Sequence, residues 1–364
     1  MTADDGLLVG LVSSPVRVEA RLVEWTPFGR LRASRRRLVE DVPAPSGFSP
    51  APVQRQLAGV DAVPLEEQAA ESWLQALASS VEQLLFGLRG PGVRLGVALD
   101  GWLDARGQHV RAAGGGPRVN DLPARLTNAL RARSLPLLEP VRAVATAARA
   151  AALGEVWSPL GAMAGGVGGL VIRWDEHLSW ADVALGRVVQ EGVELPGAAL
   201  DLGRGALARR WGALAADEGG LVRAIDRGDP RAVALAEESA RGLGRAAGRR
   251  LLERLQRASG RPPGAAGPGG AEGVVVTGCL AGLLERPTVT SSFEHGLVER
   301  LSDREDASMS AGWLERRDGR LAAREGLVRV GRTAAGLAVG AAACCMQDRL
   351  PMDAPGVGRG SEER

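Results

Sequence analysis

Residues 144–155 read V-A-T-A-A-R-A-A-A-L-G-E, and residues 162–172 read A-M-A-G-G-V-G-G-L-V-I. The first segment is dense in alanine, the strongest helix former. The second is an apolar run with paired glycines, which is typical of a buried strand entered through a tight loop. A small-residue helix followed by such a strand predicts an α/β fold that handles phosphate between two lobes. The helix nevertheless carries almost none of the polar groups that phosphate chemistry needs.

The composition is that of a globular protein. The chain has 364 residues, 45% of them apolar, which is enough for two domains. The formal charge of +2 gives no nucleic-acid signature. No run of about 18 apolar residues predicts a membrane span, and the acidic start lacks the basic region of a signal peptide, so we expect a cytoplasmic protein. Three cysteines and three histidines do not occur at zinc spacing, so we expect no metal site.

Hydrophobic periodicity predicts an alternation of strands and helices. In the first part we expect three antiparallel strands over 7–12, 17–25 and 31–39, an irregular connection over 43–64, a helix over 65–88, a strand over 93–99 and a helix over 122–133. In the second part we expect strands near 162–172, 187–190 and 273–278, and helices over 202–215, 230–258, 293–301 and 333–345. Residues 261–272 form a low-complexity loop.

Four fragments occur in an order and at distances that suggest a known family. Residues 95–104, L-G-V-A-L-D-G-W-L-D, are similar to a strand and turn ending in P-G-x-V-D, and residues 150–155 read A-A-A-L-G-E. Residues 165–172, G-G-V-G-G-L-V-I, are similar to a G-T-G-x-G-G-G-I phosphate loop, and residues 274–280, V-V-V-T-G-C-L, to an adenosine-side V-I-x-G-G-x-L. Together they resemble the ROK family of bacterial sugar kinases and sugar-responsive repressors.

This resemblance implies the two-lobed actin-like ATPase (ribonuclease H-like) α/β fold, in which each lobe is a mixed sheet with flanking helices. It implies an N-terminal lobe over 1–142 and a C-terminal lobe over 143–332. A terminal helix over 333–350 would pack back on the first lobe, followed by a disordered tail over 351–364.

The departures from the family pattern concern its catalytic residues. The family's E-N-D-x-N opening supplies a general base, and its aspartate aligns with Ala147, which cannot accept a proton. The family's first phosphate loop, G-I-D-x-G-G-T-K, aligns with residues 10–17, so its magnesium-holding aspartate falls on Val12 and its glycine pair on Ser14 and Pro15. The family's sugar-contacting histidine and zinc loop have no counterpart, so no zinc is expected.

Several residues remain as candidates for a site. By resemblance, Gly166, Gly168, Gly169 and Gly278 would admit ATP with magnesium, although tight turns and close helix packing explain such glycines equally well. Asp100 is either a substitute base or a turn-capping residue before Gly101. Asn120 and Asp121 either contact a sugar or cap the helix that follows them.

The sequence thus predicts a catalytically degenerate ROK-like protein, a pseudokinase that binds or regulates. The alternative is an active, divergent ATP-dependent sugar kinase with Asp100 as its base. The resemblance implies a sugar or sugar-phosphate ligand and a homodimer, with no nucleic-acid or membrane partner. A DNA-binding repressor is disfavoured, because the first strand begins at Leu7 and leaves no room for a helix-turn-helix before it.

Overall fold

A computed structural model of the chain describes residues 6–88, 90, 92–163, 168–175, 177–184, 186–193, 207, 218–259, 273–303, 313–318, 320–331 and 335–346. Contacts between Cα atoms divide the chain into two compact units. Unit 1 comprises residues 1–166 and 333–364, and unit 2 comprises residues 167–332. Apart from Leu207, the helix expected over 202–215 lies outside the described ranges, as do the loop over 261–272 and the tail over 351–364.

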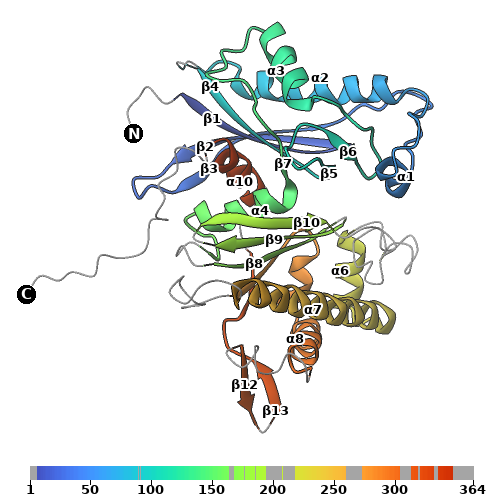
Figure 1. Ribbon diagram of the computed structural model, residues 1–364, viewed down its shortest axis with the longest axis vertical. Coiled ribbons are helices and arrows are strands. Elements are labelled where there is room, and N and C mark those ends of the chain that lie inside the picture. The colour runs from blue at the N-terminus through green and yellow to red at the C-terminus, as the bar shows by residue number, and fades with distance from the viewer. Residues whose placement is uncertain are drawn as a thin grey trace, which may run out of the picture. The chain divides into compact units, whose positions relative to one another are not determined.

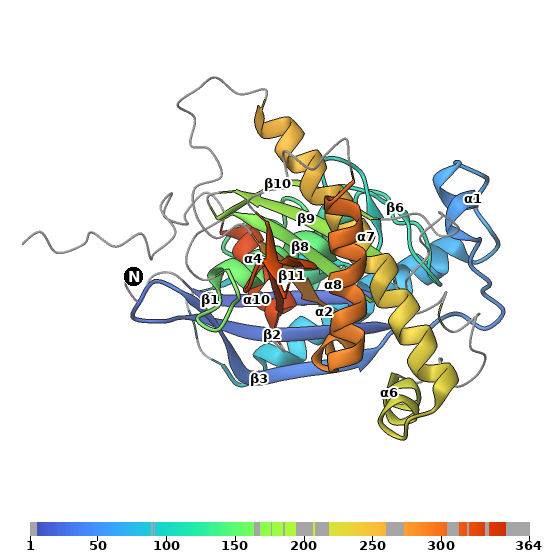
Figure 2. The same ribbon diagram turned by 90° about the horizontal axis from the view of Figure 1, so that it is seen from below.

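Unit 1 contains a five-stranded sheet with the order β3-β2-β1-β4-β7. β1 and β2 pair antiparallel, as do β2 and β3, whereas β4 runs parallel to β1 and β7 parallel to β4. Figure 2 shows β1, β2 and β3 side by side, with β3 at the edge. The strands are β1 (Leu7–Ser14), β2 (Arg17–Trp25), β3 (Leu31–Asp41), β4 (Val93–Leu99) and β7 (Ala145–Thr146). A small ribbon of β5 (Trp102–Leu103) and β6 (Val110–Ala112) follows β4.

The two faces of this sheet differ in the size of their side chains, because successive residues of a strand point to opposite faces. Val9, Leu11, Leu95 and Val97 point to a core of large apolar side chains shared with two helices, α2 (Glu66–Leu85) and α3 (Leu122–Ala132). The alternate residues point to two other helices, α4 (Ala147–Trp157) and α10 (Gly336–Cys345). Figure 1 shows α2 and α3 on one face and α10 against the other.

Glycines bring α10 against the sheet backbone. A Cβ at Gly96 would lie 1.8 Å from the carbonyl oxygen of Ala341, and one at Gly10 would lie 1.9 Å from that of Ala338. No side chain fits at such a distance, so the helix backbone lies directly on β1 and β4. This contact explains why the terminal helix is composed almost entirely of glycine, alanine and other small residues.

Unit 2 repeats the same sheet order, β10-β9-β8-β11-β14. β8 pairs antiparallel with β9, β9 antiparallel with β10, and β11 runs parallel to both β8 and β14. The strands are β8 (Gly169–Trp174), β9 (Leu178–Ala184), β10 (Arg187–Val193), β11 (Gly273–Thr277) and β14 (Val328–Val330). A hairpin of β12 (Leu314–Arg317) and β13 (Arg320–Ala323) completes the described strands of this unit.

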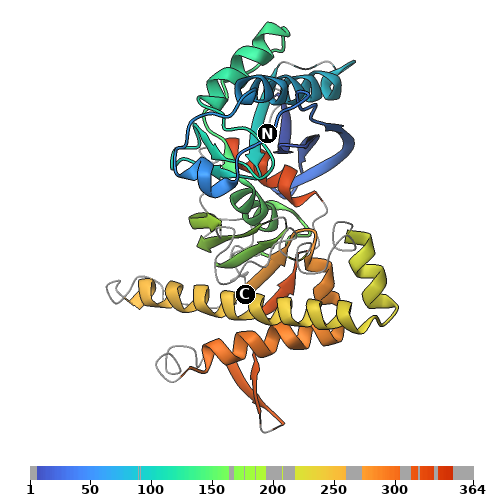
Figure 3. The same ribbon diagram turned by 90° about the vertical axis from the view of Figure 1, so that its right-hand side faces the viewer.

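The helices of unit 2 pack on a core that includes Trp174, Ile172, Val276 and Phe293. The long helix α7 and the shorter α8 run side by side (Figures 1 and 3). The helical elements are α6 (Glu218–Asp226), α7 (Pro230–Ser259), the short 3₁₀ helix η3 (Ala281–Glu285) and α8 (Pro287–Leu301).

Most expected elements are present, and the structure adds elements that the sequence pattern did not indicate, among them the β5–β6 and β12–β13 ribbons, β14 and α6. Other differences concern the bounds of expected elements. The connection over 43–64 contains a short helix, α1 (Val53–Leu57), and α8 begins at Pro287 rather than at Phe293. β9 was not indicated by the sequence pattern, because six of its seven residues are buried and alternation is lost. The units also divide after residue 166 rather than after 142, because β7 pairs with β4 and α4 packs against α10.

Candidate functional site

The carboxyl ends of β1, β4 and β7 meet at one edge of the unit 1 sheet, because the three strands are parallel. In open α/β sheets, ligands bind outside such ends. The backbone N–H of Asp100 donates to the carbonyl oxygen of Ser13 at 2.9 Å, and Leu99 pairs with Thr146 on β7. We call the group formed by Ser13, Ser14, Asp100, Thr146 and Ala147 the strand-end site.

Ala147 begins α4 within this site. The Oγ1 atom of Thr146 accepts a hydrogen bond from the backbone N–H of Arg149 at 3.1 Å, which is a normal helix N-cap. Ala147 itself is buried, with 4% of its surface exposed. The residue that the resemblance aligns with the general base of ROK kinases is therefore an alanine with a buried methyl group. The polar contact beside it, between Thr146 and Arg149, is a helix cap.

The turn between β1 and β2 is short and internally bonded. Ser14 pairs with Arg17, which leaves Pro15 and Val16 as a two-residue turn. The hydroxyl of Ser13 lies 2.9 Å and 3.1 Å from the carbonyl oxygens of Ser14 and Arg17, and it accepts a hydrogen bond from the indole N–H of Trp73 at 2.8 Å. These contacts satisfy Ser13 without a ligand.

Pro15 also occupies space that a bound group would need. A Cβ built on Gly116 would lie 2.2 Å from the Cβ of Pro15, so the proline ring packs directly on that glycine. Proline has no backbone N–H to offer a phosphate. The turn aligned with the first phosphate loop is therefore closed by packing.

Val12 belongs to an apolar cluster on the α10 side of β1. It packs against a set of buried alanines, namely Ala98, Ala145, Ala150 and Ala341. The position aligned with the magnesium-holding aspartate therefore contributes an apolar side chain to helix packing. The residues present do not fit a magnesium–nucleotide complex at this turn.

Asp100 directly follows β4 and is half-buried. It precedes Gly101, where a Cβ would lie 2.8 Å from the carbonyl oxygen of Ala112. The pair therefore turns the chain sharply into the β5–β6 ribbon. Asp100 remains the carboxylate of the strand-end site, beside Ser13 and one strand away from Thr146.

Asn120 and Asp121 lie before α3 and do not act alike. Asp121 has a left-handed backbone with φ 49°, and its side chain makes no capping hydrogen bond to the helix. Its backbone N–H instead donates to Nδ1 of His109 at 3.2 Å. The expected side-chain cap is therefore not formed. Asn120 lines a pocket.

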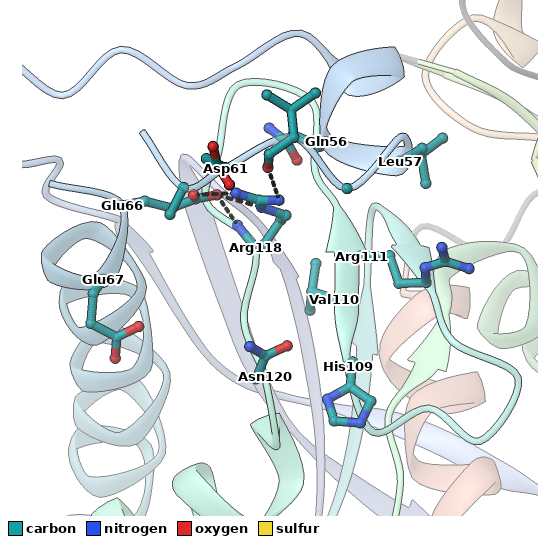
Figure 4. A pocket seen from close by; sticks show the side chains of 13 residues that line it. Gln56, Leu57, Asp61, Glu66, Glu67, His109, Val110, Arg111, Arg118 and Asn120 are labelled. Atoms are coloured by element: carbon teal, nitrogen blue, oxygen red, sulfur yellow. Dashed lines mark hydrogen bonds and ion pairs between the residues drawn. The ribbon is translucent and has the colours of Figure 1, made fainter. Parts of the chain in front are cut away.

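This pocket has a volume of about 460 Å³ and lies wholly within unit 1 (Figure 4). Its walls come from α1 and the loop after it, from the start of α2, and from β6 and the segment 118–120. Figure 4 shows Glu66 and Glu67 on one side and His109 and Arg111 on the other. Small-molecule sites are typically pockets of about 300–1,000 Å³, so the size is suitable for a ligand.

An ion pair holds one wall of the pocket in place. The guanidinium of Arg118 donates to both oxygens of Glu66, at 3.0 Å and 2.8 Å, and to the carbonyl oxygen of Val60 at 2.7 Å. Burial raises the pKa of Glu66, but the hydrogen bonds and charge of Arg118 and the N–H of Val63 outweigh it, so the net pKa is lowered. The pKa of Arg118 is raised, mainly by its hydrogen bond to Glu66.

Sequence reasoning identified Asn120 but missed most of the pocket. Gln56, Asp61, His109, Arg111 and Arg118 come from segments that no motif connects. Gln56 is the best example, since it is buried and its amide binds the carbonyl oxygen of Gly116 at 3.0 Å and the N–H of Ala113 at 3.0 Å. Nothing in the sequence marks this glutamine as buried, so the sequence held no signal for this part of the pocket.

In unit 2 the corresponding strand ends are those of β8 and β11. β8 ends at Trp174 and β9 begins at Leu178, and Gly278 follows β11 with φ +98°. A Cβ at Gly278 would lie 2.5 Å from the carbonyl oxygen of Trp174, so glycine is required there by backbone packing. The thiol of Cys279 donates to Oδ1 of Asp175 at 2.8 Å.

Gly168 and Gly169 lie at the opposite end of β8 from this turn. The guanidinium of Arg254 donates to the carbonyl oxygen of Gly169 at 2.9 Å, and a Cβ at Gly168 would lie 2.5 Å from the same guanidinium. The small size of Gly168 therefore admits an arginine of α7, which also binds the backbone of Gly169. Gly166 lies outside the described residues.

Two further properties concern the described ranges as a whole. No group of three or more histidine, cysteine, aspartate or glutamate side chains in these ranges is arranged to hold a metal ion. No helix of this part of the chain is long and apolar enough to cross a membrane.

Of three comparisons with known proteins, the one with solved structures indicates the fold. No protein-family model matches the sequence, and no curated protein sequence matches it. Among solved structures, the chain is similar to a ROK hexokinase from Thermus thermophilus, with 23% identity and a TM-score of 0.54 over 92% of this chain and 96% of that one.

Two other solved structures extend the similarity. A ROK family glucokinase from Streptomyces griseus, in complex with glucose and AMPPNP, has 17% identity and a TM-score of 0.53 over 94% of this chain and 99% of that one. A ROK family transcriptional regulator, a homologue of the E. coli MLC protein, has 16% identity and a TM-score of 0.57 over 96% of this chain and 79% of that one. The expected architecture is confirmed: this chain has the two-sheet α/β fold of the ROK sugar kinases and regulators.

Proposed function

We propose that this protein is a divergent ROK protein that has lost phosphoryl transfer and acts by binding a ligand. One observation carries the proposal: the residue that the resemblance aligns with the family's general base is Ala147, which is buried at the carboxyl end of β7. Phosphoryl transfer depends on positioned charges and on a group that orients the attacking hydroxyl. A methyl group supplies neither.

Two neighbours of Ala147 support the same conclusion. Val12, in the magnesium position, is packed among alanines, and Pro15 closes the turn where backbone N–H groups would meet phosphate. All three positions would serve the same step, phosphoryl transfer. The absence of all three groups should therefore lower the rate of that step more than the absence of any one. The proposed role is that of a binding or regulatory protein with a sugar or sugar-phosphate ligand.

A coupled ADP-release assay and a thermal-shift screen test this proposal together. The screen uses Mg-ATP, hexoses and hexose 6-phosphates. We expect no sugar-dependent ADP release and a raised melting temperature with at least one sugar or sugar phosphate. Sugar-dependent turnover at a rate typical of kinases, about 1–100 s⁻¹, would overturn the loss of catalysis.

A second candidate function is divergent sugar kinase activity with Asp100 as the base. The observation that favours it is the position of Asp100, a half-buried carboxylate hydrogen-bonded through its backbone to Ser13. Asp100→Asn keeps the size of the side chain and removes its basicity. Turnover in the wild type that disappears in this variant, with an unchanged melting temperature, would establish this alternative.

The location and assembly of the protein are part of the same proposal. We infer a cytoplasmic protein that forms a homodimer, as the resemblance to the ROK family implies. Light scattering on the purified full chain measures the second point directly. A mass of one chain at all concentrations tested would contradict the dimer.

A further inference from the structure

The pocket of unit 1 adjoins the strand-end site through Gly116. Pro15 of the β1–β2 turn packs on this glycine. Gln56, which lines the pocket, binds the carbonyl oxygen of the same glycine at 3.0 Å. The turn is closed by the proline, whereas the pocket is an open cavity of about 460 Å³. A small ligand that binds near this edge of the sheet therefore has room in the pocket.

Two antiparallel segments place polar side chains on the pocket. Val110 and Val119 exchange both backbone hydrogen bonds, at 2.8 Å and 3.1 Å, and both side chains are buried. Successive residues of an extended segment point to opposite faces. The flanking residues His109, Arg118 and Asn120 therefore point away from that core, and all three line the pocket (Figure 4).

Arg118 fixes one wall of the pocket before any ligand arrives. Its guanidinium donates to both oxygens of Glu66 and to the carbonyl oxygen of Val60, and so joins the loop after α1 to the start of α2. The charge of Asp61 acts on the same guanidinium. This wall needs little ordering when a ligand binds, which favours affinity for a small molecule.

The ionic groups that line the pocket leave no cation for an anionic ligand. Glu66 and Asp61 share the positive charge of Arg118. Glu67 pairs with an arginine of α3 at 2.7 Å. Arg111 carries its guanidinium away from the cavity (Figure 4). A phosphate group in the pocket would therefore face carboxylates without a free cation beside them, and it would be repelled.

Three groups remain that suit an uncharged ligand. The side chains of Asp61 and Asn120 are exposed, and neither makes a hydrogen bond to the described part of the chain. Nδ1 of His109 accepts the N–H of Asp121, so in the neutral ring the proton is on Nε2, which is then a donor. A carboxylate accepts, an imidazole N–H donates and an amide does both, whereas each hydroxyl group of a saccharide can donate and accept. This set of groups therefore matches a ligand with several hydroxyl groups.

We propose that this pocket, rather than the strand-end site, binds an uncharged hexose through Asp61, Asn120 and Nε2 of His109, with no place for a phosphate group. The inference rests on the proposed binding function and gives its ligand a position and a charge state. The two fail in different ways. A chain that binds no sugar would overturn both, whereas a sugar bound at another place would overturn this inference alone.

Isothermal titration calorimetry on the full chain tests the ligand class. The probes are D-glucose, D-mannose and D-galactose, and then the 1-phosphate and the 6-phosphate of the hexose that binds most tightly. These two derivatives carry the phosphate at opposite ends of the ring. We expect saturable binding of at least one hexose, and at least about tenfold weaker binding of the derivative whose phosphate enters the pocket. No hexose binding up to about 10 mM, or equal affinity for the hexose and both phosphates, would overturn the proposal.

Two variants test the position. Asp61→Ala and Asn120→Ala each remove one exposed group from the pocket and leave the core untouched. We expect each to weaken hexose binding by roughly tenfold. The matched controls are Asp41→Ala and Asn128→Ala, exposed residues that do not line this pocket. Unchanged affinity in the pocket variants, or an equal loss in the controls, would overturn the position. A loss of binding in Asp100→Asn with full binding in both pocket variants would place the hexose at the strand-end site instead.

Discussion

The two sheets of this protein have the same strand order and the same strand directions, but their packing differs. In unit 1, one face of the sheet meets α10 through the backbone at Gly10 and Gly96. In unit 2, β8 and β11 face α7 and α8 with large side chains such as Trp174 and Phe293. Close backbone approach therefore joins a helix to the sheet in unit 1, beside a core of large side chains on the opposite face. In unit 2 the close approach is between the two helices α7 and α8, at Gly244 and Gly296, and the sheet packs through large side chains.

The turn after β1 in unit 1 and the turn after β8 in unit 2 also differ in their packing and charge. The β1–β2 turn holds Pro15 against Gly116, with the Ser13 hydroxyl bonded internally. The β8–β9 turn carries Asp175, which pairs with Arg173 at 2.5 Å and accepts from Cys279. The first turn is therefore closed by packing, whereas the second turn carries a charged side chain.

Breaking the backbone contact of unit 1 should have the largest effect. Gly96→Val places two methyl groups and a Cβ where the carbonyl oxygen of Ala341 lies 1.8 Å from the ideal Cβ position. We expect loss of folded protein, or destabilisation by about 3 kcal/mol or more, in urea unfolding followed by circular dichroism. Gly282→Ala is the matched control, since a Cβ there meets nothing within 4 Å. Equal stability of both variants would refute the close contact.

The buried ion pair of unit 2 should rank next. Asp182 is 3% exposed, and its carboxylate pairs with the guanidinium of Arg254. Arg254→Met removes the closer of two arginine partners and leaves Arg257 at 3.4 Å from the carboxylate, so we expect a loss of roughly 2–3 kcal/mol. Arg32→Met, which breaks the exposed pair with Glu24, should change stability by less than about 1 kcal/mol. A similar small effect in both variants would mean that the buried pair contributes little.

A single hydrogen bond below the first turn should have a smaller effect. Trp73→Phe removes the indole N–H that donates to Ser13 at 2.8 Å, while keeping most of the apolar surface. We expect a loss of about 1–2 kcal/mol, measured as a shift in the urea midpoint. Adding Ser13→Ala should then cause little further loss, because its main side-chain partner is already gone. A fully additive double variant would argue against this bond.

The smallest expected effect is the pH dependence of the Glu66–Arg118 pair. Because the pKa of Glu66 is lowered in the folded state, its contribution is fully present above the ordinary value of 4.5 and is lost as pH falls through the lowered value. Glu66→Gln should therefore differ from the wild type more at pH 7 than at pH 3.5. Urea midpoints at the two pH values measure this, and an equal difference at both would contradict the lowered pKa.

Much of the fold could be predicted because the patterns are local. The helix with Trp73 and Leu77 on one face, and the apolar runs of β1, β4 and β11, follow from periodicity alone. β9 could not be predicted from the sequence pattern, because it is buried on both faces and its residues do not alternate between apolar and polar. The phosphate-loop reading of Gly168 and Gly169 could not anticipate Arg254, which is more than 80 residues away in the chain.

Some properties of the candidate site also follow from the sequence alone, and others only from the tertiary structure. That Ala147 cannot accept a proton and that Pro15 has no N–H are properties of the residues, so the sequence by itself determined the loss of those groups. Tertiary structure alone decided that Val12 is packed among alanines and that Pro15 lies on Gly116. It also brought Gln56, Asp61, Arg111 and Arg118 together around one pocket. These contacts join segments far apart in the chain, and long-range packing leaves no periodic or motif-like mark in the sequence.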